Sequence, residues 1–197
     1  MLGIFAIIAI GSITGVLMYN ELLRLVGETY PDVAGRTQFF ARLDMAVNIL
    51  AWVFQGLVVA WLIRTVNLSG ALIVIPIAAL ISFAALAFTF FAAAPILMVL
   101  AGGQVIRRAG EFGIAKPSRE VLFTILDPES KYKAKNFMDT VMQRGSDWAG
   151  VWLHVFLQSL GFGLSAFAAL CGGSMVAVGA ISWGLGRAFE RRRAGTS

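Results

Sequence analysis

Long apolar stretches without a charged residue alternate with shorter charged segments along the chain. No Asp, Glu, Lys or Arg occurs in residues 1–20, 45–63, 65–106 and 148–186. A helix needs roughly 20 mostly apolar residues to cross the hydrocarbon core of a bilayer. The last two stretches are about twice that length, so each is expected to turn once and to hold two helices. The pattern predicts an all-α integral membrane bundle of six transmembrane helices.

The turns inside the two longest stretches are expected at 92–95 and 161–163, where small residues, proline and glycine interrupt the apolar pattern. The first stretch lacks a positive n-region and exceeds the apolar core of a signal peptide, about 7–15 residues, so it is expected to be a true span. These boundaries predict one domain, 1–197, with spans at about 1–26, 36–64, 69–91, 94–113, 132–161 and 164–188.

Composition agrees with this class. The chain is 58% hydrophobic and 14% charged, whereas soluble domains are nearer half apolar and a quarter charged. Its formal charge of +5 would suggest a nucleic-acid partner in a soluble protein. Here the basic residues flank apolar stretches, where they act as topology signals and contact lipid headgroups. We therefore expect the lipid bilayer, and no nucleic acid, as a partner.

Basic residues gather on one side of the predicted membrane. The segments after the second and fourth spans, together with the C-terminal segment, carry Arg64, Arg107, Arg108, Lys116, Arg119, Lys131, Lys133, Lys135, Arg187, Arg191, Arg192 and Arg193. On the opposite side, Arg24 and Arg36 are balanced by Glu21, Glu28 and Asp32. The positive-inside rule then predicts that both termini are cytoplasmic.

Residues 114–131 are expected to form a long cytoplasmic loop. Four apolar residues there share one helical face: Val121, Leu122, Ile125 and Leu126. This spacing predicts a short amphipathic helix on the membrane surface. Asp127 and Pro128 then read as an N-cap and a first helical residue for the fifth span. An ordinary surface loop is the alternative.

Polar residues inside the spans are candidates for function, because ionisable groups are costly there. The fifth span places a polar stripe on nearly one helical face: Asp139, Gln143, Asp147, His154 and Gln158, with Arg144 on its edge. The second span adds Asp44, Asn48 and Gln55, with Arg42 near its outer end, and the fourth adds Gln104, Arg107, Arg108 and Glu111. Polar faces of this kind must point into the interior of a helix bundle or into a water-filled cavity.

Two interpretations of these stripes stay open. In the first, spans two, four and five, with span one, line a solute path, and Lys135 and His154 take part, the histidine by relaying protons. In the second, Arg144–Asp147 and Lys135–Asp139 are ion pairs within one helix, and His154 is a packing residue.

The sequence contains no P-loop, no Gly-x-Ser-x-Gly and only one histidine. An enzyme is therefore not expected, and neither a cofactor nor a metal site is predicted. Cys171 is the only cysteine, so no internal disulfide is possible.

Several motifs resemble those of one transporter family. They are the Arg107–Gly110 run, the Lys116-Pro117-Ser118-Arg119-Glu120 run, the Lys131-x-Lys133-x-Lys135-x-x-x-Asp139 run followed by Arg144, and the segment 42–48. Together they resemble the bacterial and plastid ATP/ADP translocases of the major facilitator superfamily, and more closely their bacterial relatives. The resemblance covers essentially the whole chain.

The resemblance implies the C-terminal half of a twelve-span transporter in a bacterial inner membrane. It implies nucleotide exchange by alternating access, a loop motif at Lys116, Pro117, Arg119 and Glu120, and a transport role for Lys135. Asp147 stands near a position where the translocases carry a basic residue. A less charged solute, or a proton-coupled one, fits the residues about as well.

Two functions follow. The first is transport of a small, anionic solute, with nucleotide exchange as the case that the resemblance implies. The chain would then be half of a secondary transporter, paired with a second copy or with an N-terminal half. The alternative is a non-transporting membrane subunit that scaffolds a larger membrane complex.

Overall fold

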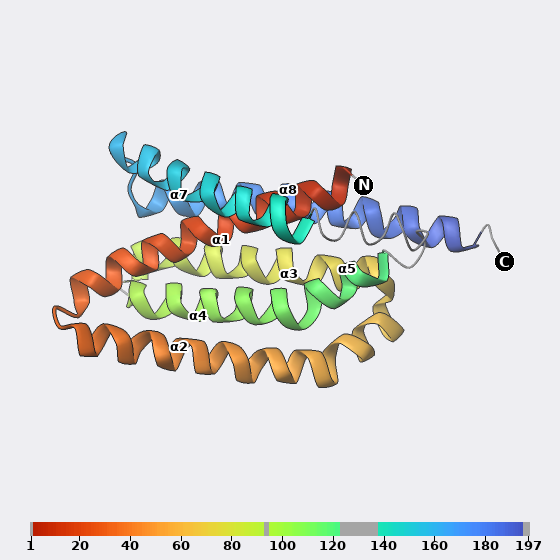
Figure 1. Cartoon of the computed structure of the whole chain (residues 1–197), viewed down its shortest axis with the longest axis horizontal. Helices are drawn as coiled ribbons and strands as arrows, with labels where there is room; N and C mark the ends of the chain where they lie inside the picture. The colour runs from red at the N-terminus through yellow and green to blue at the C-terminus, as the bar shows by residue number, and fades with distance from the viewer. Residues whose placement is uncertain (1, 93–94, 123–137, 195–197) are drawn as a thin grey trace.

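The computed structural model describes residues 2–92, 95–122 and 138–194, and all secondary structure within them is helical. The helices lie roughly along one direction and form an elongated bundle (Figure 1). This confirms the helical class that the apolar stretches predict. The described helices are α1 (Leu2–Thr29), α2 (Val33–Val53), η1 (Phe54–Val58), α3 (Val59–Ala92), α4 (Ile96–Gly110), η2 (Glu111–Ala115), α5 (Lys116–Leu122), η4 (Met138–Met142), α7 (Gln143–Ser159) and α8 (Leu164–Ala194).

The helix α1 lies at the centre of the arrangement. It packs against α7 and α8 on one side and against α4 on the other, while α3 packs on α8 and α4, and α2 packs on α4. Figure 1 shows α1 crossing obliquely between the α7/α8 pair and the α2–α4 helices. The helices α2 and α7 therefore lie at opposite edges, with α1 and α4 between them.

The turns that follow α1 and α7 lie together with the C-terminal end of α3 at the left end of Figure 1, which we name the turn end. At the first of these turns, the Asp32 carboxylate caps α2 by accepting a hydrogen bond of 2.6 Å from the Gly35 amide. At the last, α7 ends at Ser159 and Gly161 takes a positive φ of 77°, which glycine adopts at little steric cost. This is the turn that the sequence places at 161–163.

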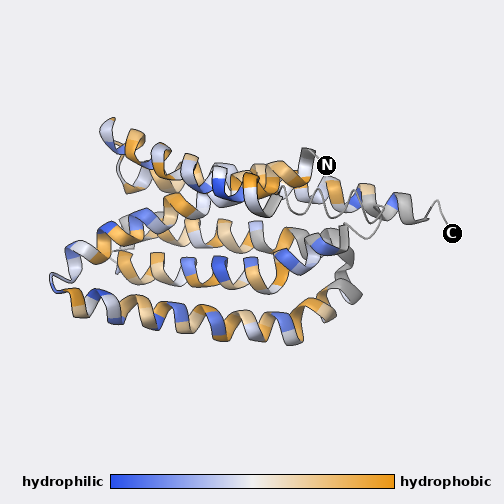
Figure 2. Cartoon of the chain, viewed as in Figure 1, coloured by the Kyte–Doolittle hydropathy of each residue, from blue (hydrophilic) through white to orange (hydrophobic). Residues whose placement is uncertain are grey.

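Apolar side chains fill the interior and also cover much of the outside. Leu22 and Val26 of α1 pack with Val47 of α2 and Leu100 of α4 in the core, each 2% exposed or less. Outside, Trp52 of α2 and Phe88 of α3 are more than two-thirds exposed. Figure 2 shows hydrophobic residues spread over the outward faces of the helices. An outer surface of this kind suits contact with lipid.

Three described helical segments are long and apolar enough to cross a membrane: Gly3–Thr29, Val33–Leu62 and Leu164–Ala188. A shorter apolar segment, Pro76–Leu86, lies within α3. The α4 and α7 helices are shorter, at 15 and 17 residues, and both carry charged residues. Length and composition thus support membrane insertion.

Two expected boundaries take a different form in the structure. The chain reverses direction between α2 and α3 at the right end of Figure 1, and it does so without a non-helical residue, because α3 is helical from Val59 to Ala92. The segment expected to be a loop from 114 onward is helical where it is described, because η2 and α5 continue α4, and α5 overlaps the short helix expected there. Ile114 is buried against Leu62 there, which explains why this segment packs into the bundle. The rest of that loop, with the Asp127–Pro128 cap, lies outside the described residues.

Close helix contact at Gly113 provides a test of the packing. A Cβ atom added to Gly113 would lie 2.5 Å from Phe54 Cβ and 3.0 Å from the Ala51 carbonyl oxygen. The substitution Gly113→Ala is expected to destabilise the protein by about 1–3 kcal/mol through overpacking. Thermal unfolding of the purified protein in detergent would measure this as a lower melting temperature.

The matched control is Gly102→Ala on α4, where an added Cβ meets nothing within 4 Å. That change is expected to leave stability unchanged or to raise it by up to about 1 kcal/mol, because alanine favours the helix. Equal melting temperatures for the two variants would contradict the close contact between η2 and the α2–η1 helix.

Candidate functional site

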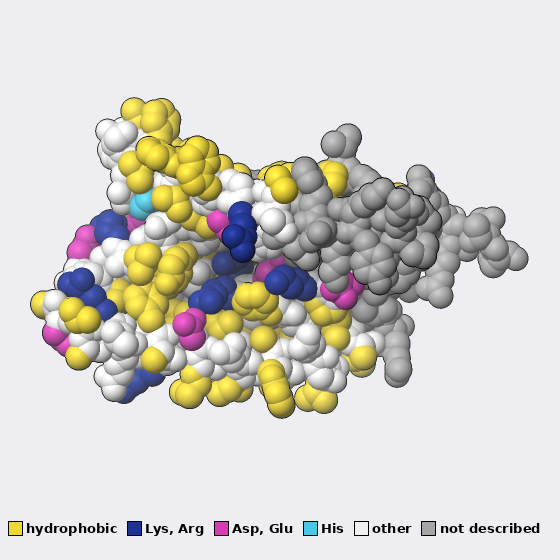
Figure 3. Space-filling view, in the orientation of Figure 1, with side chains coloured by type: hydrophobic (Ala, Val, Ile, Leu, Met, Phe, Trp, Pro, Cys, Tyr) yellow, Lys and Arg dark blue, Asp and Glu magenta, His cyan; other side chains and the backbone are white. Residues whose placement is uncertain are grey.

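A groove of about 710 Å³ runs between α1, α2, α4, η2 and α7. Its polar lining residues are Ser12, Tyr19, Asn20, Asp44, Gln104, Arg107, Arg108, Glu111, Gln143 and Asp147. Figure 3 shows charged side chains gathered in the hollow between the upper and lower helices of that view. Apolar side chains, among them Ile8, Val16 and Val151, share its walls. We name this feature the polar groove.

Arg107 is fixed at the base of the groove by two neighbours. Its Nε donates a hydrogen bond of 3.2 Å to Gln104 Oε1, one turn earlier on α4, and Gln104 is itself 1% exposed. A Cβ atom on Gly15 of α1 would lie only 2.6 Å from an Arg107 guanidinium nitrogen. The guanidinium therefore lies directly against the α1 backbone, a position that only a glycine at residue 15 permits.

Arg108 links α4 to α2 across the groove. Its guanidinium donates a 2.6 Å hydrogen bond to Asp44 Oδ1, and the two side chains are 31% and 55% exposed. A pair this exposed in water would contribute little to stability. In a low-dielectric membrane the same pair neutralises two charges that could not separately face lipid.

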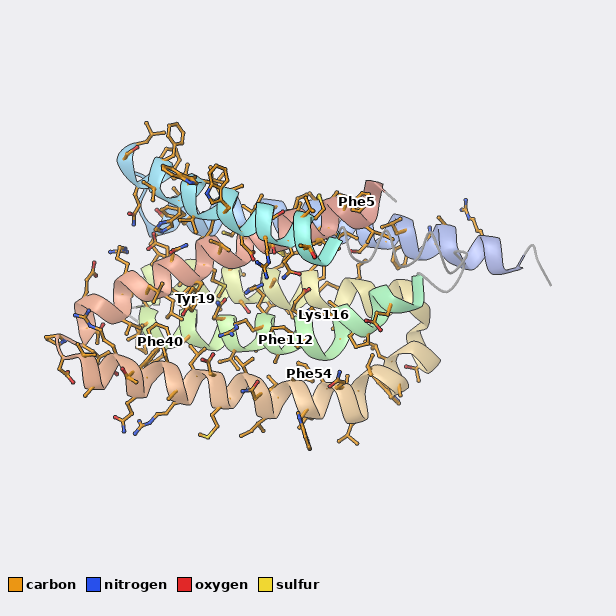
Figure 4. The ribbon with its side chains drawn as sticks, in the orientation of Figure 1. Phe5, Tyr19, Phe40, Phe54, Phe112 and Lys116 are labelled. Atoms are coloured by element: carbon orange, nitrogen blue, oxygen red, sulfur yellow. The ribbon has the colours of Figure 1, made fainter. Side chains whose placement is uncertain are left out.

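Aromatic contacts close the groove beside these charges. Tyr19 of α1 meets Phe40 of α2 with ring centroids 5.9 Å apart, and Lys116 Nζ lies 4.9 Å from the Phe112 ring centroid. Figure 4 shows Tyr19 and Phe40 nearer the turn end and the Phe112–Lys116 pair, on η2 and α5, farther from it.

A second polar cluster lies nearer the turn end and outside the groove. Glu21 of α1 is 3% exposed, and its Oε1 lies 3.2 Å from His154 Nε2 of α7. Its other oxygen accepts a 3.0 Å hydrogen bond from Arg24, which also binds Glu28 at 2.7 Å. His154 packs on the Phe167 ring of α8 at a centroid distance of 5.0 Å. The cluster therefore connects three helices.

The structure brings seven of the polar-stripe candidates together in the groove: Asp44, Gln104, Arg107, Arg108, Glu111, Gln143 and Asp147. Arg42 and Asn48 lie exposed on α2 and Gln55 on η1, and Arg144 and Gln158 lie exposed on α7. None of these five residues lines the groove. His154 is buried against Glu21 instead. Lys135 and the Asp139 side chain fall outside the described part of the chain.

The ion pair expected between Arg144 and Asp147 is absent among the described side chains. Asp147 turns toward the groove, whereas Arg144 is exposed. Of the loop motif, Lys116 and Glu120 are exposed and Pro117 is half-buried on α5, while the Arg119 side chain is not described. Ser118, inside the same motif, is fully buried.

The residue pattern along the chain did not link Glu21 to His154 or Gly15 to Arg107. Both contacts join residues far apart in the chain, and helical spacing reports only neighbours within one helix. The one signal available was the ionisable Glu21 close to the end of an otherwise apolar span.

Comparisons of the chain with protein-family models, with curated proteins and with solved structures found no match. The function is therefore inferred from the geometry of the groove.

The buried Glu21 carboxylate should matter for stability. The substitution Glu21→Ala leaves His154 and the Arg24 guanidinium without their shared acceptor. Removing one member of such a buried charged network costs about 3 kcal/mol. Thermal unfolding in detergent is expected to show a clearly lower melting temperature.

Glu28→Ala is the matched control, because Glu28 binds the same arginine at the surface, where its side chain is 59% exposed. An exposed pair of this kind contributes well under about 1 kcal/mol. If Glu21→Ala were no more destabilising than Glu28→Ala, the buried network would not hold the three helices together.

Proposed function

We propose that this chain is one half of a secondary transporter, and that its polar groove forms part of the path for a small solute. In this proposal the six helices of the bundle all span the membrane, in the arrangement of a half of a major facilitator protein. Alternating access then exposes the groove to one side of the membrane at a time. The proposal rests on one observation: two arginines and three carboxylates line a groove between the helices of the bundle.

The free-energy cost of a charge inside a membrane indicates that the groove contains water or is covered by a partner. A charged side chain near the bilayer centre costs roughly 2.5–3.5 kcal/mol on the insertion scale. Arg107, Arg108 and Asp147 all line one groove, whereas the large exposed residues of α3 and of α8 before Arg187, such as Phe88 and Val176, are hydrophobic. Charges concentrated on one concave face suit a path for solute better than contact with hydrocarbon.

The helix lengths are compatible with six spans. The helical run from Ile96 through Leu122 has no interruption and would extend about 40 Å at 1.5 Å per residue. The described run from Met138 to Ser159 extends about 33 Å, close to the hydrocarbon thickness of roughly 30 Å. Polar residues lower the hydropathy of both runs, and several of these residues line the groove.

Only the helices of this chain line the groove, and its open side lies between α2 and α7. In a transporter the binding site lies between two repeats or two bundles that move against each other. A second copy of this chain, or an N-terminal half, would cover the open side and complete the path. Placement of the termini in the cytoplasm of a bacterial inner membrane belongs to the same proposal.

One observation favours the alternative, a scaffolding subunit. Trp148, Trp152 and Phe156 form an exposed aromatic face along α7, with Trp148 and Trp152 in contact at 6.0 Å. Aromatic residues are enriched where membrane proteins and their partners meet. In this alternative the aromatic face of α7 binds another subunit, and side chains of that subunit fill the groove.

Access of water to the groove separates the two functions. Replacing Cys171, the only cysteine, with serine gives a background for single cysteines at Ser12 and Asn20, which line the groove. A charged thiol reagent in native membranes is expected to label both at least about ten times faster than a cysteine at Val176, on the apolar outside of α8. Mass spectrometry of the purified chain measures the labelling.

Reactivity at Ser12 and Asn20 no greater than at Val176 would reject a water-filled path and favour the scaffold. The native mass in a mild detergent provides a second readout. Two copies, or one copy with a similarly sized bundle, agree with a transporter of two halves, whereas one copy among larger unrelated partners agrees with the scaffold.

A further inference from the structure

We infer that the solute recognised by the polar groove is a zwitterion, with its anionic group on Arg107 and its cationic group between Asp147 and the Trp148 ring. This inference rests on the proposed function, because it assigns the solute of the same groove. It names a chemical class that differs from a polyanionic nucleotide.

The balance of charge in the groove is the first argument. Arg107 and Arg108 contribute two positive charges, and Asp44, Glu111 and Asp147 contribute three negative ones, so the lining carries a formal net charge of −1. Arg108 and Asp44 already neutralise each other through their ion pair of 2.6 Å. A solute with several negative charges would therefore meet a lining with no net positive charge, and the low dielectric of the membrane strengthens that repulsion.

Arg107 is the suitable hydrogen-bond donor for an anionic group. Its guanidinium is held by Gln104 and by the close approach to Gly15, and all three residues line the groove. A guanidinium fixed in this way loses little conformational entropy on binding, and its N–H groups match the geometry of a carboxylate or phosphate. One such site accommodates a single anionic group.

Asp147 and Trp148 provide the complementary site. They are neighbours on α7, both line the groove, and Trp148 is 68% exposed. Among the described side chains Asp147 makes no ion pair within 4 Å, and it attracts the Arg107 guanidinium only at longer range. A carboxylate beside an exposed indole favours an ammonium group, because the ring face attracts cations and the carboxylate neutralises their charge.

The remaining walls suit the uncharged part of a small molecule. Ile8, Val16 and Leu23 of α1 lie along the groove between its polar groups. A volume of about 710 Å³ is well within the range of small-molecule sites. Amino acids, betaines and the headgroup of a zwitterionic phospholipid all combine an anionic and a cationic group in this size range.

Direct binding tests the inference. The purified chain, in nanodiscs made of phosphatidylglycerol alone, is titrated by calorimetry with alanine and glycine betaine as zwitterions, acetate as a monoanion, choline as a cation and ATP as a polyanion. A zwitterion is expected to bind at least about ten times more tightly than acetate, choline or ATP. Addition of phosphatidylethanolamine to the nanodiscs distinguishes the source: competition by this lipid identifies its headgroup as the occupant, and no competition identifies a free solute.

Substitutions locate the two charges. Asp147→Asn is expected to weaken binding of the zwitterion at least about tenfold and to remove its advantage over acetate. Glu28→Gln, a matched carboxylate-to-amide change outside the groove, should bind as the unmodified chain does. Circular dichroism of each variant verifies that it remains folded.

Tighter binding of ATP than of either zwitterion would overturn the inference, and so would unchanged zwitterion affinity in Asp147→Asn. Absence of binding by every probe in the phosphatidylglycerol nanodiscs would overturn it as well. The proposed function fails separately, when cysteines at Ser12 and Asn20 do not react with the charged thiol reagent.

Discussion

The arrangement of this bundle depends on the place that it gives to the Arg107 guanidinium. A charge inside an apolar bundle must be covered by polar partners or by a cavity, since hydrocarbon cannot solvate it. Gln104 supplies a hydrogen bond, and Gly15 allows the α1 backbone to lie against the guanidinium. This contact brings α1 and α4 together at the base of the groove, and the walls of the groove follow from where α2 and α7 pack around them.

The helix α1 also holds the second polar cluster. Glu21 lies on the buried side of the same helix and connects it to His154 of α7 and, through the Phe167 contact of that histidine, to α8. Close packing supports the same connection, because a Cβ atom on Gly150 of α7 would lie 3.0 Å from Val16 Cβ. The α1 and α7 walls of the polar groove are thus joined by direct contacts between these two helices.

Helical spacing correctly predicted some of the residues that line the groove, but it also predicted residues that do not line it. Asp44, Asn48 and Gln55 share a sequence pattern, but only Asp44 lines the groove. Leu43 and Val47 fix the rotation of α2, because they are buried in the core and leave Asp44 at the edge of the groove while Asn48 and Gln55 stay exposed. On α7, burial of His154 and Leu157 likewise directs one side of the polar stripe inward and leaves Arg144 and Gln158 outside.

By itself the sequence determined that the described part of the protein is helical, that three of its helical segments are apolar enough for a membrane, and that a turn at 161–163 separates α7 from α8. These properties depend on local composition and on the 3.6-residue period, both of which are readable along the chain. Only the tertiary structure decided that Gly15 meets Arg107, that Glu21 meets His154, and that Arg108 binds Asp44. Each of these contacts joins two helices, and their partners are set by helix rotation and packing, which no spacing within a single helix records.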